Sequence, residues 1–563
     1  MPFCNRLSKN YPMHIFIKNK KLFLYISLLT LVGGFFRFYN LNWDSGNFFH
    51  PDERNIANSV SYIKFFSQMN PNFFAYGGFL IYLYHATGEI ISRLTNNPAW
   101  IYDWGHINTI GRFYSALFST LTIPLIFILT QKVFNKYTGA IASLLTTFTV
   151  TFIQTSHYSI TENFLVLISL LICFFSIKLL KTRKLKDYIL CGVFIGIATA
   201  TKTTALSFII FPFIAHLLTV IKYPYNFIKR VLLLIIFLTI SFFTFTLFSP
   251  YTFLKWDKFI ESMRYESGVA LGTLPVPYTL QFTHTISYLF QLKNFIWQIG
   301  PISLLIIPTI ILFIAIILTT KKPKYILLIS FPFIYFLYVG LWHTKFIRFM
   351  LPAIPFLIIL ISYLLYVILK KTKVFGKILM IISIFLTILW SLAFFSIYTK
   401  EQTRITASKW IYENIPTQSK LLGEHWDDGL PITIKSSSPS LYSIEQLTIY
   451  EPDNTQKAYY YADKLSKADY LIINSRRLYG TLINLPAKYP LTSRYYKLLF
   501  ESKLGYEKVA EFASYPSFLG IEINDDQSEE TFQVYDHPKV LIFKNEKKLS
   551  FDNIFSLISQ NKL

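Results

Sequence analysis

Three carboxylates stand close together in the stretch NWDSGNFFHPDERN (42–55): Asp44, Asp52 and Glu53. A carboxylate can act as a general base that takes a proton from a hydroxyl group, or it can help to bind a cation. Other polar residues stand beside apolar sequence further along the chain: Arg112, His157, Glu162, Lys202, His343, Lys345 and Arg348. Cationic side chains bind anionic groups such as phosphate. The set therefore combines candidate bases with candidate anion ligands.

Each of these residues also has a simpler explanation. Asp52 follows a proline and begins a helix-like run, so Asp52 or Glu53 would then only cap that helix and complement its dipole. Lys345 and Arg348 would extend toward lipid headgroups, as isolated cations near the end of a span usually do. Lys202 is harder to explain in this way, because it lies between two short apolar runs without an external loop to solvate it. A cation in that position needs an anionic partner.

A metal ion is a second use for the acidic residues. Asp52, Glu53, His157 and Glu162 would hold a divalent cation if the fold brings them together. No pair of His or Cys residues has the spacing of a zinc site, and a single histidine is more often a satisfied polar residue than a ligand. The sequence therefore assigns no certain cofactor and leaves the metal requirement open.

The elements that position these residues are predicted to be membrane helices. Of the 563 residues, 53% are hydrophobic and 15% are charged, whereas about a quarter of an average soluble domain is charged. A helix needs about 20 apolar residues to cross the hydrocarbon of a bilayer. We therefore expect a mainly α, polytopic membrane protein with about eleven transmembrane helices. The predicted spans are 22–39, 108–130, 138–157, 162–180, 187–203, 205–221, 231–250, 295–319, 325–342, 347–369 and 378–398.

Basic residues predict the orientation of the spans. Lys18, Lys20 and Lys21 precede the first span, which places the N-terminus in the cytoplasm by the positive-inside rule. Alternate threading then gives cytoplasmic loops that are all basic, at 131–137, 181–186, 222–230, 321–324 and 370–377. The net charge of +23 thus reflects membrane topology, and it requires no nucleic-acid partner.

Most of the acidic residues of the membrane half fall on the outside in this topology. Acidic residues contribute little to orientation, so this sorting indicates a functional external face. Only Asp187 falls inside. The external ones are Asp44, Asp52, Glu53, Glu89, Asp103, Glu162, Asp257, Glu261 and Glu266.

The chain is predicted to divide at about residue 400. Residues 1–400 form the multi-span membrane domain, with long external loops at about 40–108 and about 250–294. Residues 401–563 are typical of a soluble α/β domain, with strands such as YLIIN and VLIFKN and helical stretches such as TASKWIYENI. Because the last span runs outward, this domain is expected to be extracytoplasmic. Its EHWDDGLP segment would bind a cation or an acceptor, or would simply form an acidic surface turn.

Carboxylates and cations on one external face, under aromatic-rich spans, suit the transfer of a sugar from a polyprenyl phosphate. The phosphate would lie at headgroup level while the lipid tail runs between helices. Lys and Arg would stabilise the departing phosphate. A carboxylate would take the proton of the acceptor hydroxyl as the anomeric carbon becomes oxocarbenium-like.

Seven segments together resemble a known family. They are HPDERN, IGRFYSALF, SHYSITENFL, GIATATKTTAL, KFIRFMLPAIP, EHWDDGLP and ETFQVYDHPKV, and they are similar to bacterial family 39-type glycosyltransferases. That family is related to the protein O-mannosyltransferases and the lipid A aminoarabinose transferases. The resemblance covers most of the chain, and it implies a GT-C-type fold, a polyprenyl-phosphate-linked sugar donor, inversion at the anomeric carbon and a bacterial cytoplasmic (inner) membrane.

The resemblance also implies roles for the acidic residues. In the family an acidic motif of the first external loop carries catalysis, and this motif matches Asp52 and Glu53. The second external carboxylate position matches Glu162, where relatives more often carry aspartate. We expect Asp52 to be the general base and Glu53 to position the acceptor or the base.

The basic residues receive a binding role from the same resemblance. Cations near the outer ends of later spans contact the donor phosphate in relatives, and Lys202, Lys345 and Arg348 match them. Arg112 and His157 are further candidates for binding this phosphate. The expected partners are then a polyprenyl-phosphate-linked hexose or pentose, a protein, lipid or glycan acceptor, and membrane lipids.

Two other classes of protein remain open at this stage. A lipid or solute transporter, such as a flippase, also has many spans, but it more often shows paired interrupted helices with charges near the membrane midplane. No such symmetry is visible in this sequence. A non-catalytic membrane assembly protein would not need clustered carboxylates and cations.

Overall fold

The computed structural model describes residues 20–223, 225, 227–434 and 437–559. Lys18, Pro224 and Asn226, which belong to segments used to predict orientation, lie outside the described residues. The chain forms two compact units. The first comprises Met1–Leu41, His50–Ser267 and Ile286–Ser391, and the second comprises Asn42–Phe49, Gly268–Thr285 and Leu392–Leu563. The division of the chain at residue 400 stays a prediction from the sequence.

The first unit is a bundle of helices, as the apolar runs predict. Among the described residues, eight helical stretches are long and apolar enough to cross a membrane. They are α2 (Lys20–Phe38), α6 (Trp104–Val133), α9 (Glu162–Thr182), η1 with α11 (Thr203–Lys222), α12 (Phe227–Phe248), Leu289–Thr320 with α15 (Leu289–Ile299) and α16 (Ile306–Thr320), η4 with α18 (Ile347–Thr372), and Val374–Asn414, which begins with α19 (Val374–Phe395). A mainly α, polytopic membrane protein is thereby confirmed.

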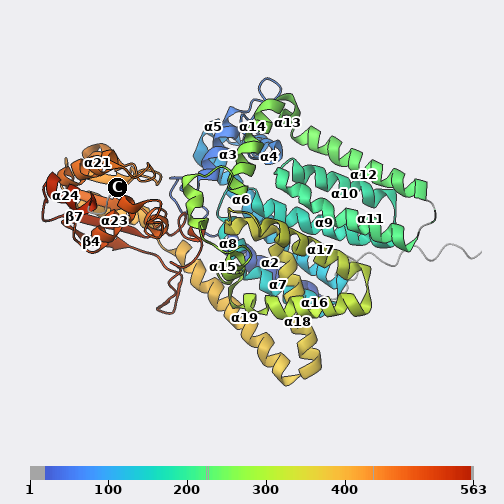
Figure 1. Ribbon diagram of the computed structural model, residues 1–563. Coiled ribbons are helices and arrows are strands. Elements are labelled where there is room, and N and C mark those ends of the chain that lie inside the picture. The colour runs from blue at the N-terminus through green and yellow to red at the C-terminus, as the bar shows by residue number, and fades with distance from the viewer. Residues whose placement is uncertain (1–19, 224, 226, 435–436, 560–563) are drawn as a thin grey trace, which may run out of the picture. The chain divides into compact units, whose positions relative to one another are not determined.

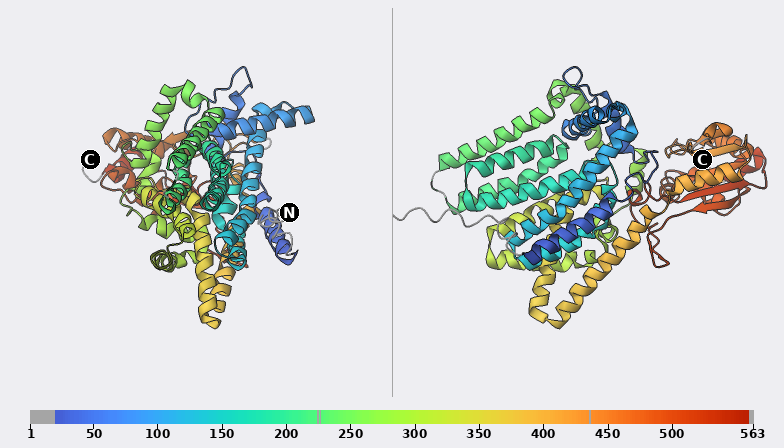
Figure 2. Two further views of the ribbon diagram at one scale, coloured as in Figure 1. Left: turned by 90° about the vertical axis from the view of Figure 1, so that its right-hand side faces the viewer. Right: turned by 180° about the vertical axis from the view of Figure 1, so that it is seen from behind.

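The predicted runs all contain helix, but three of them are shorter than a full span. α17 (Pro323–Val339) has 17 residues and α10 (Leu185–Thr199) has 15. The run at 138–157 is divided into α7 (Lys136–Thr147) and α8 (Val150–Ser156). Figure 1 shows that α10 nevertheless lies beside α9 and α12 in the bundle, and the right-hand view of Figure 2 shows the same helices from behind.

A buried arginine explains the break between α7 and α8. The guanidinium of Arg37, in α2, donates hydrogen bonds to the carbonyl oxygens of Thr146 at 2.9 Å and Thr147 at 3.0 Å. It also donates to Ser119 Oγ at 2.8 Å. The last carbonyls of α7 are therefore satisfied by a side chain and not by the next helical turn.

A backbone contact explains the early end of α10. The amides of Gly77 and Phe79 donate to the carbonyl oxygens of Thr201 at 2.9 Å and Ala200 at 3.0 Å. A β-carbon at position 77 would lie 2.1 Å from the Ala200 oxygen, so this approach requires glycine. Lys202 follows directly in extended conformation.

Large apolar side chains of α12, such as Phe242 and Phe243, remain exposed, as expected for a helix that faces lipid.

Shorter helices join the spans. The connecting helices are α3 (Pro51–Tyr62), α4 (Gly78–Thr95), α5 (Ala99–Tyr102), α13 (Tyr251–Leu254), α14 (Trp256–Leu271) and the turn η2 (Pro277–Phe282).

The second unit contains a five-stranded sheet in the order β2-β1-β3-β7-β4. β1 runs parallel to β2 and β3, whereas β7 is antiparallel to β3 and β4. Buried side chains on both faces form two cores, one with α21, α23 and α24 and the other with α20.

The strands predicted at YLIIN and VLIFKN and the helix at TASKWIYENI are confirmed as β3, β7 and α20. The bounds are α20 (Thr403–Asn414), β1 (Lys420–Glu424), β2 (Ser443–Leu447), α21 (Thr455–Lys467), β3 (Tyr470–Ile473), α22 (Tyr479–Leu482), α23 (Pro490–Phe500), β4 (Tyr506–Phe512), β5 (Ser517–Phe518), β6 (Ile521–Glu522), β7 (Val540–Asn545) and α24 (Phe551–Ser559).

Candidate active site

Asp52 lies in the first turn of α3, but it does not cap that helix. The cap is His50, whose Nδ1 accepts a hydrogen bond from the Asp52 amide at 3.2 Å, with Pro51 at the first helical position. Burial lowers the pKa of His50 to about 4, so the imidazole is neutral and able to accept. The carboxylate of Asp52 is thus free for other contacts.

The Asp52 carboxylate forms an ion pair with Arg348, the second residue of η4 (Ile347–Ala353). The hydroxyl of Tyr76 also hydrogen-bonds to it. Burial acts to raise the pKa of Asp52, but Arg348 and, less strongly, Lys202 outweigh it and hold the pKa at about 2. The side chain keeps 17% of its surface exposed, so an ionised carboxylate is open to a substrate.

Glu162 and Lys202 form a second ion pair, with Lys202 Nζ 2.9 Å from Glu162 Oε1. Lys202 Nζ also lies 4.9 Å from the centre of the Tyr76 ring. The anionic partner that Lys202 was expected to need is therefore a residue of the chain itself. Glu162 begins α9, where the positive end of the helix dipole favours a carboxylate.

The two ion pairs form a single group. The charge of Lys202 acts on Asp52, and the charges of Arg348 and Asp52 act on Glu162. We call Asp52, Glu162, Lys202 and Arg348 the charged cluster. The structure therefore brings together four of the residues singled out from the sequence, although the most distant two are 296 positions apart.

Glu53 and Arg112 occupy a different environment. Arg112 donates from Nε and Nη2 to the two oxygens of Glu53 at 2.8 and 2.7 Å, and both side chains are buried. The Ser159 amide donates to Glu53 Oε1 at 2.6 Å, and Arg112 Nη1 donates to the Leu41 carbonyl oxygen at 2.8 Å. This pair fastens α3 to α6 and to the segment before α9. The neighbouring Gly111 permits the approach, because a β-carbon there would lie 1.7 Å from Ser159 Oγ.

The remaining two candidates bind backbone oxygens. His157 places Nδ1 2.8 Å from the Ile153 oxygen and Nε2 2.9 Å from the Tyr39 oxygen. Lys345 is buried and donates to the His343 oxygen at 2.9 Å. Within the described residues, no group of three or more His, Cys, Asp or Glu side chains is placed to hold a metal ion. The four residues that the sequence suggested as metal ligands, Asp52, Glu53, His157 and Glu162, each make the other contacts described above.

Sequence reasoning missed Tyr76 and His50. His50 precedes Pro51, and a polar residue before a proline at a helix start is a usable cap signal. Tyr76 carries no such signal, because its place over Lys202 depends on the close approach of Gly77 to Ala200.

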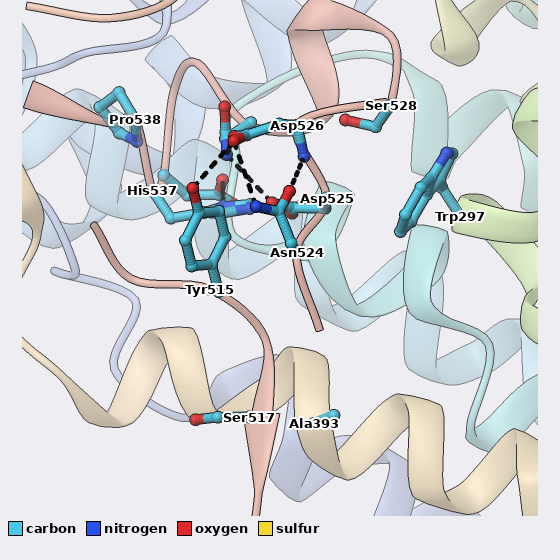
Figure 3. A network of polar contacts seen from close by, with 12 residues as sticks. Trp297, Ala393, Tyr515, Ser517, Asn524, Asp525, Asp526, Ser528, His537 and Pro538 are labelled. Carbon is cyan, nitrogen blue, oxygen red and sulfur yellow. Dashed lines mark hydrogen bonds and ion pairs between the residues drawn. The ribbon is translucent and has the colours of Figure 1, made fainter. Parts of the chain in front are cut away.

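The second unit contains a buried trio of its own (Figure 3). Its members are His537, Asp525 and Asp536, of which Figure 3 labels the first two. His537 Nε2 lies 2.7 Å from Asp525 and its Nδ1 lies 2.5 Å from Asp536. The Tyr398 hydroxyl donates to Asp536 at 2.8 Å, and the Gln533 amide donates to Asp525 at 3.0 Å. Burial acts to lower the pKa of His537, but the two carboxylates outweigh it and raise the pKa to about 10. His537 is therefore a charged, structural residue near neutral pH.

The EHWDDGLP segment is more than an acidic surface turn. The side chain of Asp427 is buried and forms an ion pair with the buried Arg404 at 2.8 Å. Burial raises the pKa of Glu424 to about 8, so this carboxyl group is mostly protonated at neutral pH. Trp426, in contrast, is exposed.

The second unit is predicted to lose stability in alkaline solution. The pKa of His537 is about 10 in the folded protein against about 6.5 in an unfolded chain, so its contribution is complete below about pH 6.5 and is lost as the pH rises through 10. Glu424 acts with the same sign, because its pKa is also raised on folding. The change in stability can be measured as the melting temperature of the full-length protein in detergent between pH 6 and pH 10. The variant His537→Gln should flatten the dependence, and an unchanged slope would contradict the assignment.

The chain is similar to known proteins in part of its sequence and in its fold. Residues 104–251, which include Arg112, Glu162 and Lys202, match the family described as dolichyl-phosphate-mannose-protein mannosyltransferase. The oligosaccharyltransferase of Archaeoglobus fulgidus, tethered with an acceptor peptide, shares the fold with a TM-score of 0.50 and 12% identity over 94% of this chain and 89% of that chain. ArnT from Cupriavidus metallidurans, bound to undecaprenyl phosphate, gives a TM-score of 0.46 and 10% identity over 94% and 99% of the two chains. No curated protein matches the sequence.

The fold and the family match define the class as a membrane protein with the GT-C-type fold of glycosyltransferases. The predicted GT-C-type fold is thereby confirmed, and the family match contains three of the seven sequence segments that indicated the resemblance: IGRFYSALF, SHYSITENFL and GIATATKTTAL.

Proposed function

We propose that the protein is a membrane glycosyltransferase that moves a sugar from a polyprenyl-phosphate donor to an acceptor on the outer face of a cytoplasmic membrane. The charged cluster carries this proposal, because it places two carboxylates and two cations around one site. The family match supports a lipid-phosphate-linked hexose as donor, although a pentose has the same chemistry. In this proposal the N-terminus is cytoplasmic and the C-terminal domain at 401–563 is extracytoplasmic.

Lys202 and Arg348 bind the donor phosphate in the proposed reaction. The bond between the anomeric carbon and the phosphate oxygen breaks, and the two cations stabilise the charge on the departing polyprenyl phosphate. A bond forms from the acceptor oxygen to the anomeric carbon on the opposite face of the sugar, so the configuration inverts. The second carboxylate, Glu162, keeps the ammonium of Lys202 in place.

Asp52 is the general base in this scheme. With a pKa of about 2 it is ionised at neutral pH, but it is a weak base while Arg348 is its partner. A donor phosphate that binds Arg348 weakens this pairing, and the pKa of Asp52 then rises toward the ordinary value for aspartate. The base is thus strengthened only when the donor is in place. Glu53 positions Asp52 through α3 and does not touch the substrate.

The test of the function is release of polyprenyl phosphate in detergent, without any ion gradient. Purified protein is offered undecaprenyl-phosphate-linked hexoses, with a membrane extract as the source of acceptor. Transfer under these conditions would support an enzyme, since a transporter requires two compartments. Absence of release with every sugar offered would count against the proposal.

Removal of the Lys202 charge should weaken donor binding. We expect Lys202→Ala to bind undecaprenyl phosphate at least about tenfold more weakly than wild type, because a charge-assisted contact to phosphate is lost. Lys258→Ala is the matched control, since Lys258 is exposed and forms an ion pair with Glu261 of the same helix, α14. Equal affinity in Lys202→Ala and wild type, measured by calorimetry on folded protein, would remove the phosphate role.

A further inference from the structure

Glu266 is a third carboxylate near the charged cluster, and the reaction described above gives it no role. It lies in α14, in the second long external loop. Met263 of the same helix accepts a hydrogen bond at its Sδ from Thr203 Oγ1 at 3.4 Å, and Thr203 directly follows Lys202. Residues three apart share a helix face, so Glu266 stands one turn from this contact, on the side of α14 that meets Lys202.

The electrostatics agree with this placement. Lys202, Asp52 and Arg348 all act on the Glu266 carboxylate. The side chain is open to solvent, yet enough protein surrounds it that burial raises its pKa. Among the described residues, the Glu266 side chain makes no hydrogen bond or ion pair, whereas the Asp52 and Glu162 side chains each pair with a cation. The site therefore contains one carboxylate without a protein partner.

We infer that Glu266 binds the transferred sugar by accepting hydrogen bonds from its hydroxyl groups. This inference rests on the proposed function, which places the donor phosphate at Lys202 and Arg348. The sugar is bonded directly to that phosphate, so a carboxylate beside Lys202 faces the sugar. An ionised carboxylate only accepts hydrogen bonds and repels phosphate. Within the donor lipid, hydroxyl groups occur on the sugar alone.

Two ligands separate a sugar contact from a phosphate contact. Full-length protein in detergent is titrated with undecaprenyl phosphate, which has no sugar, and with undecaprenyl-phosphate-linked mannose, glucose and galactose. For the hexose lipid that wild type binds most tightly, we expect Glu266→Gln to lower the affinity about tenfold, because charge-assisted hydrogen bonds are lost. The affinity for undecaprenyl phosphate itself should not fall, because this lipid has no sugar and the substitution removes a negative charge that repels phosphate.

Glu261→Gln is the matched control. Glu261 lies in the same helix, is exposed and pairs with Lys258 at 3.0 Å, so its loss should change neither affinity. Equal weakening of both lipids by Glu266→Gln would overturn the inference, since it would indicate an effect on the phosphate site. Unchanged binding of the hexose lipid with slower transfer would also overturn it, in favour of an acceptor contact. If wild type binds none of these lipids, the proposed function fails and the inference fails with it.

Discussion

Replacement of Asp52 by asparagine is expected to abolish sugar transfer while the protein remains folded and inserted. Asparagine has nearly the shape of aspartate but cannot take a proton from the acceptor hydroxyl. A positioned general base typically accelerates a reaction about 10²–10⁴-fold, so the rate of transfer should fall at least about 10²-fold. Release of undecaprenyl phosphate from the labelled donor, wild type beside Asp52→Asn, is the measurement.

A second substitution controls for any general effect of removing an external carboxylate. Asp257→Asn serves this purpose, because Asp257 is exposed in α14 and forms part of neither ion pair of the cluster. Asp52→Asn should also bind undecaprenyl phosphate at least as tightly as wild type, since Arg348 loses its competing partner. Full activity in Asp52→Asn would contradict the assignment of Asp52 as the general base.

Truncation of Glu53 is expected to have the largest effect on stability. Glu53→Ala leaves the buried Arg112 guanidinium without its carboxylate, and breaking a buried pair in this way typically costs about 3–5 kcal/mol. The Ser159 amide loses its acceptor at the same time. Thermal unfolding of the protein in detergent measures the loss, and Arg112→Ala should behave in the same way.

A double substitution distinguishes a buried ion pair from mere packing. Glu53→Leu combined with Arg112→Leu removes both charges, so it should be less destabilising than either single change. Glu261→Ala, which breaks the exposed pair with Lys258, should stay within about 1 kcal/mol of wild type. Additive losses in the double variant, or a large loss in the exposed one, would contradict this account of the Glu53–Arg112 pair.

The helices and strands were predictable where local sequence determines them. Apolar runs located the spans, and short β-branched stretches located β3 and β7. The run at 138–157 looked like an ordinary span because nothing in it marks a break. The run at 187–203 is short and contains Lys202 near its end, but the sequence does not show what ends the helix. Their helices end where Arg37 and Gly77, more than 100 positions away, bind the terminal carbonyl oxygens. Such contacts are not visible in a window of neighbouring residues.

The candidate site shows the same limit at the level of single residues. Asp52 and Glu53 are adjacent acidic residues of one motif, and the sequence does not show how differently they are placed. Asp52 is partly open beside Arg348, whereas Glu53 is fully buried against Arg112. Successive residues of a helix point about 100° apart, which separates their environments. Lys202 could be singled out because its lack of solvation was evident in the sequence. Glu266 could not, because its place depends on how α14 meets Thr203.

The close approach at Gly111 limits how this protein can diverge. The smallest possible side chain at that position would put a methyl carbon 1.7 Å from Ser159 Oγ and 2.7 Å from Ser159 Cβ, so even alanine would force Ser159 to move. Selection for a different sugar or acceptor can change loops and contacts around the cluster. A change at residue 111 would displace Ser159, whose amide donates a hydrogen bond to Glu53. We therefore expect glycine at this position to persist across homologues whose substrates differ.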